Sequence, residues 1–191
     1  MKKSVLQTGL AFVYDVKNKT RGILMSKWLE ALKNNSLDEI KSLLDAKEDV
    51  NEENESGESV LACALRSRCD FSLLMFLVEH GADIYAFDNE GVSVFDMAVT
   101  YNNIEMVEFL MSKGVDVNAT RRRSGFTPLM CAACYGRNAI VELFLAKGAN
   151  KNAVDSKGLN ATDFARKMNK KSILKLLSYD ENAPKNTTYA R

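Results

Sequence analysis

Histidine, proline and cysteine are all scarce in this chain of 191 residues. His80 is the only histidine, so a cluster of histidine metal ligands is excluded and a Ser/His or Cys/His nucleophile system is disfavoured. The two prolines leave long stretches in which helices need not be interrupted. The cysteines are too few for a disulfide scaffold and are predicted to be reduced thiols: Cys63, Cys69, Cys131 and Cys134.

A strong charge of one sign and a long apolar run are also missing. With 26 basic and 25 acidic residues, the chain offers no whole-protein argument for binding nucleic acid or an anionic membrane. No run approaches eighteen apolar residues, so no membrane span is predicted. Met1-Lys2-Lys3 resembles the start of a signal peptide, but Gln7 and Thr8 interrupt the apolar stretch that follows. We therefore predict a cytoplasmic protein. We also predict a folded core, because 46% of the residues are hydrophobic.

Glycines recur at a fixed period. One set, each member followed within a few residues by an apolar run, is spaced by 34, 34 and 33 residues: Gly57, Gly91, Gly125 and Gly158. A second set, out of phase with the first, is spaced by 33 and 34 residues: Gly81, Gly114 and Gly148. Two interleaved sets with one period indicate an internal structural repeat.

The residues around these glycines predict two short helices in each repeat. Ser59, Ser93 and Thr127 follow the first glycines and can cap a helix by accepting hydrogen bonds from its first turn. Pro128 suits the first helical position after Thr127. The second glycines follow apolar segments and suit left-handed caps at helix C-termini. Alanines in the first helices and apolar pairs at helical spacing in the second predict helix pairs that bury their faces against neighbouring pairs.

These motifs resemble the ankyrin repeat family. The closest match runs from Gly125-Phe126-Thr127-Pro128-Leu129 to Ala133 and continues to Gly136 and Ile140-Val141-Glu142-Leu143. The loop Gly114-Val115-Asp116-Val117-Asn118-Ala119 also resembles the family's hairpin loop. The resemblance implies an all-α fold of stacked helix-turn-helix units with projecting hairpin loops. The family's usual histidine after Thr-Pro-Leu is replaced by Ala62, Asp96, Met130 and Asp163.

The resemblance covers about five repeats, over residues 26–179, of which the first and last act as caps. Residues 1–25 are predicted to be an N-terminal extension, either a strand around Phe12–Val16 or a poorly ordered segment. Residues 180–191 are predicted to be a polar tail.

No pattern of residues predicts catalysis. Cys131-Ala132-Ala133-Cys134 has the CxxC spacing, but it lacks both further metal ligands and a βαβ context. The family alignment implies that Cys63 and Cys131 face the core and that Cys134 lies on the surface. His80 precedes Gly81 and suits a helix C-terminus. We therefore predict a non-enzyme without metal or cofactor.

A protein partner is the predicted ligand. In the family, partners bind the concave surface formed by hairpin tips and first helices, and the matching positions here are aromatic, basic or polar: Phe87, Asn89, Glu90, Val92, Tyr101, Arg121, Arg122, Arg123, Phe126, Tyr135 and Lys157. Aromatic residues and arginine are enriched at interface hot spots. Two interpretations remain open: a groove that orients a partner, or a solvated arginine loop with rings that cover their own hairpins.

Two other ligands are considered. Some small bacterial ankyrin proteins assist catalase by delivering haem, and an exposed tyrosine such as Tyr101 can ligate iron. Nucleic acid is disfavoured, because the cluster of Arg121 to Arg123 is short. The sequence predicts a monomer that binds a protein partner.

Overall fold

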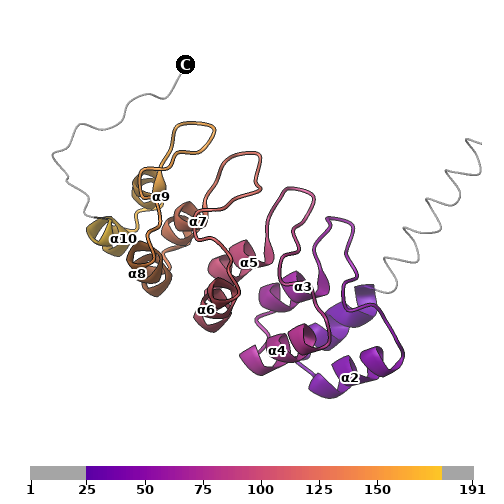
Figure 1. The fold of residues 1–191 in the computed structure, drawn as a ribbon. Helices are drawn as coiled ribbons and strands as arrows, with labels where there is room; N and C mark the ends of the chain where they lie inside the picture. The colour runs from indigo at the N-terminus through magenta and orange to yellow at the C-terminus, as the bar shows by residue number, and fades with distance from the viewer. Residues whose placement is uncertain (1–24, 178–191) are drawn as a thin grey trace, which may run out of the picture. The chain divides into compact units, whose positions relative to one another are not determined.

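The computed structural model describes residues 25–177. The strand expected around Phe12–Val16 and the expected C-terminal tail lie outside the described residues. The chain divides into two compact units, unit 1 (Met1–Asn89) and unit 2 (Glu90–Arg191), and each is described by itself (Figure 1). Between residues 25 and 177 the regular elements are helices, with one isolated bridge between Glu53 and Ser59, so the all-α prediction is confirmed.

Unit 1 contains two helix pairs. Helical residues 25–33 precede α2 (Leu37–Asp45), and α3 (Val60–Arg66) packs against α4 (Phe71–Glu79). Trp28, Leu61 and Leu74 are fully buried in this unit. Lys47 stands where the later repeats have a loop glycine, and it adopts the left-handed conformation itself with φ of +59°.

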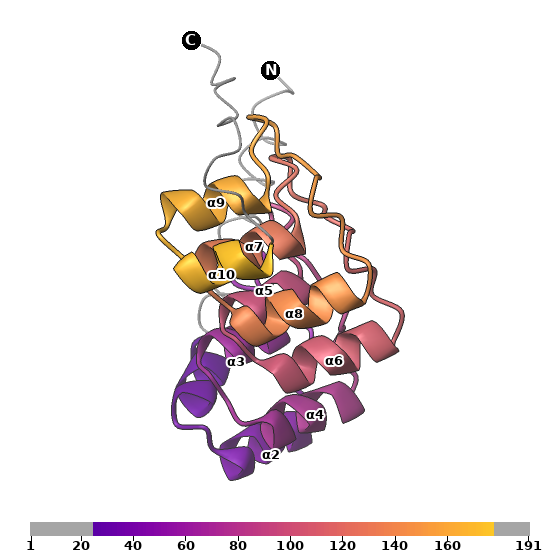
Figure 2. The same ribbon diagram turned by 90° about the vertical axis from the view of Figure 1, so that its left-hand side faces the viewer.

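Unit 2 contains three helix pairs in two layers. The first helices of the pairs are α5 (Val94–Thr100), α7 (Pro128–Tyr135) and α9 (Ala161–Lys167). The second helices are α6 (Ile104–Ser112), α8 (Asn138–Ala146) and α10 (Lys171–Leu176). Helix α7 packs against both α5 and α9, and α8 packs against both α6 and α10 (Figure 2).

Helices α3, α5 and α7 begin where the predicted capping residues Ser59, Ser93 and Thr127 place them, and α9 begins after Asn160, which is not among the predicted caps. Ser59, Ser93, Thr127 and Asn160 are the N-caps of α3, α5, α7 and α9, and each side chain accepts a hydrogen bond from the backbone N–H three residues later. Pro128 occupies the first position of α7, as predicted. The second helices end as predicted as well: Gly114 follows α6 with φ of +90°. Local sequence therefore sets the helix boundaries.

Asparagine side chains link successive hairpin loops within each unit. In unit 2, Asn118 Oδ1 accepts from the backbone N–H of Asn150 at 2.7 Å, and Asn118 Nδ2 donates to Gly148 O at 3.3 Å. In unit 1, Asn51 makes the corresponding bonds with Asp83 and Gly81. These bonds join backbone groups of one hairpin to the side chain of the preceding one, and they fix the register of neighbouring repeats.

Helices of the described segment are short. The bounded helices contain six to nine residues, and none of them combines the length and the apolar character required to cross a bilayer.

Candidate functional site

The predicted partner-binding residues divide between the two units. Phe87 and Asn89 belong to unit 1, and the other nine belong to unit 2. Phe87 is exposed. Asn89 donates from its backbone N–H to Ser56 O at 3.1 Å and from Nδ2 to Glu55 O at 3.4 Å. Asn89 therefore joins two hairpin tips of unit 1.

In unit 2 the hairpin tips bring basic residues together. The backbone N–H of Ser156 donates to Ser124 O at 2.7 Å, which joins the tip after α6 to the tip after α8. Arg123 and Lys157 are the neighbours of these two serines, and both are exposed. Arg121 is exposed as well. Glu90 and Val92 lie on a different hairpin, the one that precedes α5.

The two predicted tyrosines lie at the ends of the first helices. Tyr101 is the half-buried C-cap residue of α5, and Tyr135 is the exposed last residue of α7. Burial is the largest cause that raises the pKa of Tyr135; Cys131 and Cys134 raise it further, and Arg122 lowers it. The Tyr135 ring lies 5.8 Å below the guanidinium carbon of Arg137. The structure thus places Tyr101 and Tyr135 at the same end of two first helices that pack against each other, and Arg137 against the Tyr135 ring.

Arg122 and Phe126 are engaged inside the unit. Arg122 Nη2 lies 3.4 Å from Asp96 Oδ1, and the side chains are 20% and 3% exposed respectively. The guanidinium carbon of Arg122 is 5.2 Å from the centre of the Phe126 ring. Phe126 meets Phe164 edge to face with 4.9 Å between ring centres. These two predicted binding residues therefore hold the hairpin after α6 against α5 and α9.

Asp96 is a residue whose role sequence reasoning missed. It is buried, and its Oδ2 accepts from the backbone N–H of Ser93 at 3.0 Å and from Ser93 Oγ at 2.8 Å. Together with the bond from Asp96 N–H to Ser93 Oγ, this forms a reciprocal capping box. The Ser-to-Asp spacing of three residues signals that box, but the pairing with Arg122, from the next repeat, has no local signal.

The cysteines agree in part with expectation. Cys63 and Cys131 are buried, as the resemblance implies, but Cys134 is only partly exposed rather than a surface residue. Burial raises the pKa of Cys134, and Lys170 and Lys167 lower it. Burial also raises the pKa of Cys131 to about 11 and that of Cys63 to about 12. Over residues 25–177, no group of three or more His, Cys, Asp or Glu side chains is arranged to hold a metal ion.

Cysteine reactivity should follow this order of burial. At pH 8 we expect 5,5′-dithiobis(2-nitrobenzoic acid) to modify Cys134 first and Cys131 only on unfolding, because the thiolate is the nucleophile and a raised pKa removes it. Peptide mass spectrometry of a time course measures both rates. A Cys134→Ser variant should lose the early phase, and modification of Cys131 as fast as Cys134 would contradict the prediction.

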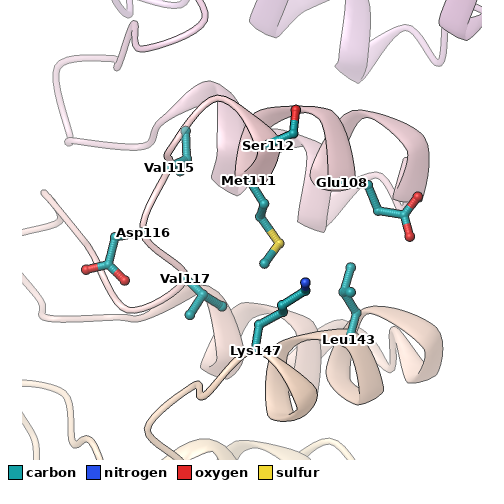
Figure 3. A pocket seen from close by; sticks show the side chains of 8 residues that line it. All are labelled: Glu108, Met111, Ser112, Val115, Asp116, Val117, Leu143 and Lys147. Carbon is teal, nitrogen blue, oxygen red and sulfur yellow. The ribbon is translucent and has the colours of Figure 1, made fainter.

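A pocket of about 590 Å³ lies away from the predicted residues, between α6 and α8 (Figure 3). Met111, Val117 and Leu143 provide its apolar part, and Glu108 and Lys147 stand on its opposite sides. Sequence reasoning did not single it out, because these residues come from two repeats and share no motif.

Comparison with known protein families finds two family models that match this chain. A family model described as ankyrin repeats (3 copies) matches residues 28–121, and one described as ankyrin repeat matches residues 124–156. The E3 ubiquitin-protein ligase hecd-1 of Caenorhabditis elegans is 38% identical over 104 residues, which is 54% of this chain and 4% of the ligase.

Two further proteins are similar to part of this chain. Rabankyrin-5 of Homo sapiens is 32% identical over 120 residues, which is 57% of this chain and 10% of that protein. The probable 26S proteasome regulatory subunit p28 of Saccharomyces cerevisiae is 29% identical over 133 residues, which is 68% of this chain and 58% of the subunit. The chain spans a small part of the first two relatives and less than two thirds of the third.

Proposed function

Because the chain belongs to the ankyrin repeat family, we propose that it is a non-catalytic module that binds a protein partner through the hairpin side of unit 2. The hairpin side is defined as the hairpin tips of that unit together with its first helices α5, α7 and α9 and the C-cap residues of those helices. Ankyrin repeats indicate a protein–protein interaction module, and the family models match residues 28–121 and 124–156.

The position of the exposed apolar residues is the observation that carries this proposal. Among the described residues of unit 2, the exposed large hydrophobic side chains are Tyr135, Val154 and Met168, which are 48%, 54% and 49% exposed. Tyr135 ends α7, Met168 follows α9, and Val154 lies in the hairpin between α8 and α9. All three are therefore on the hairpin side, and none comes from α6, α8 or α10. Apolar side chains gathered on one face are a mark of a protein-binding surface.

The remaining predictions belong to the same proposal. We propose that the repeat domain extends over residues 26–179 and that the protein acts as a monomer in the cytoplasm. The four cysteines are free thiols, which suits a reducing compartment.

Alanine substitution at the hairpin side tests the proposal. Tyr101→Ala and Tyr135→Ala should each weaken the affinity for a captured partner by about thirtyfold. Truncation of a central aromatic side chain typically costs about 2 kcal/mol of binding free energy. Partners would be captured from a lysate with immobilised protein, identified by mass spectrometry, and remeasured by calorimetry with purified protein.

Glu108→Ala and Glu142→Ala are the matched controls, since both residues are exposed on the second helices of the same unit. They should leave partner affinity unchanged, and the melting temperature of the Tyr135→Ala variant should remain that of the parent protein. If both tyrosine variants bind the partner with unchanged affinity, the hairpin side is not the binding surface.

A further inference from the structure

Charge is distributed unevenly over the surface of unit 2. The exposed basic residues of the hairpin side include Arg123, Lys157 and Lys167. The exposed charged residues of the second helices have both signs, namely Glu105, Glu108 and Glu142 together with Lys171 and Lys175. An excess of exposed basic residues on the hairpin side attracts an acidic partner and raises its association rate.

Most carboxylates on the hairpin side are already engaged within unit 2. Asp155 Oδ1 accepts from the backbone N–H groups of Lys157 and Leu159, both at 2.8 Å. Asp163 lies 2.8 Å from Arg166 and caps α9. Asp96 is bound by Ser93 and Arg122, as described above. The bound carboxylates do not lie within ion-pair distance of Arg123, Lys157 or Lys167 in the described segment.

Exposed apolar side chains accompany the basic residues on the hairpin side. Tyr135 and Met168 end two first helices, α7 and α9, that pack against each other. Lys167 directly precedes Met168 and is exposed, so a cation adjoins this apolar residue. A methionine adapts its shape to a bound group, and a tyrosine ring offers a rigid apolar surface.

We propose that the segment bound by the hairpin side of unit 2 is an acidic protein segment with a large apolar side chain. Its carboxylates bind Arg123 and Lys157 at the joined hairpin tips, and its apolar side chain packs on Tyr135 and Met168. This inference rests on the proposed function, and it adds the chemistry of the partner. It also uses the cationic and apolar parts of the same face together.

An acidic protein segment fits this face better than nucleic acid does. Strong nucleic-acid binding draws on several phosphate contacts along a continuous track, each of which releases counterions. The exposed cations of the hairpin side are few, and the whole chain has a formal net charge of only +1.

The test uses a synthetic probe of known composition. A fluorescein-labelled peptide of eight glutamates with one central tryptophan should bind the full chain in a polarisation assay. Its affinity should fall about fivefold between 50 and 300 mM NaCl, because salt screens exposed ion pairs. A peptide with serines in place of the glutamates should bind at least tenfold more weakly.

Charge reversal provides the matched comparison. The double variant Arg123→Glu/Lys157→Glu should weaken the acidic peptide at least tenfold. The double variant Lys147→Glu/Lys171→Glu changes the net charge by the same amount. Its residues lie on the second helices, Lys147 as the C-cap residue of α8 and Lys171 in α10. This variant should change the affinity for the acidic peptide less than twofold. Met168→Ala should weaken the tryptophan peptide more than an otherwise identical alanine peptide.

Three results would overturn the inference: no binding of the acidic peptide, equal losses in the two double variants, or tighter binding of a single-stranded DNA oligomer than of the peptide at 150 mM NaCl. Failure of the inference is distinguishable from failure of the proposed function. If Tyr135→Ala weakens binding of a captured partner but Arg123→Glu/Lys157→Glu leaves its affinity unchanged, only the inferred acidic character of the partner is wrong. If the tyrosine variants also leave the affinity of the partner unchanged, the hairpin side is not the binding surface and the proposed function is wrong.

Discussion

Gly91→Ala should lower the free energy of unfolding by about 3 kcal/mol or more, because two separate costs combine at this residue. Gly91 has φ of +79°, a left-handed conformation that an alanine adopts only with strain. A Cβ at Gly91 would also lie 2.7 Å from the carbonyl carbon of Arg121 and nearer still to its oxygen. Both atoms are backbone, so a side-chain rotation cannot relieve the contact.

Gly158→Ala separates these two costs. Gly158 has a similar φ of +76°, but a Cβ there would meet no atom within 4 Å. This variant should cost only about 1–2 kcal/mol, the typical strain of a left-handed alanine. Urea denaturation followed by circular dichroism measures both variants, and a similar loss of stability in the two would contradict the steric explanation.

Arg122→Ala is the second large effect, with an expected loss of about 3 kcal/mol. The substitution leaves the Asp96 carboxylate, which is 3% exposed, without its nearest cation at 3.4 Å. It also removes the guanidinium from the Phe126 ring, 5.2 Å away. A buried carboxylate whose partner is deleted retains its desolvation cost without the compensating attraction.

Arg123→Ala is the control, because the neighbouring arginine is exposed and should cost less than about 0.5 kcal/mol. A double-mutant cycle with Asp96→Asn isolates the pair, since asparagine retains an oxygen that can accept from Ser93 but removes the charge. The coupling energy between Asp96 and Arg122 should be at least about 1 kcal/mol. Equal losses from the two arginine variants would show that the observed pairing contributes nothing to stability.

Binding and stability should therefore separate along three consecutive arginines. Arg122 contributes to the fold of unit 2, whereas we propose that Arg123 binds the partner. A sequence that presents three identical residues in a row offers no local basis for this distinction. The distinction follows from Asp96, which the chain supplies from the preceding repeat.

The sequence alone determined the helices and their ends, because those features depend on neighbours a few residues apart. Thr127 caps α7, Pro128 begins it, and Gly114 turns the chain after α6. The burial of Cys63 and Cys131 also followed from their shared repeat position. The motifs around the periodic glycines resemble the ankyrin repeat family, and the family models confirm that resemblance.

The tertiary structure alone decided which side chains remain available on the hairpin side. Phe126 packs on Phe164, and Asn118 binds the backbone of the next hairpin. Tyr135 remains exposed, whereas Tyr101 is half-buried. The first two outcomes depend on contacts between residues of neighbouring repeats, which the stacking of repeats creates. Periodicity specifies that repeats stack, but the individual side chains that meet in the stack decide which residues are left for a partner.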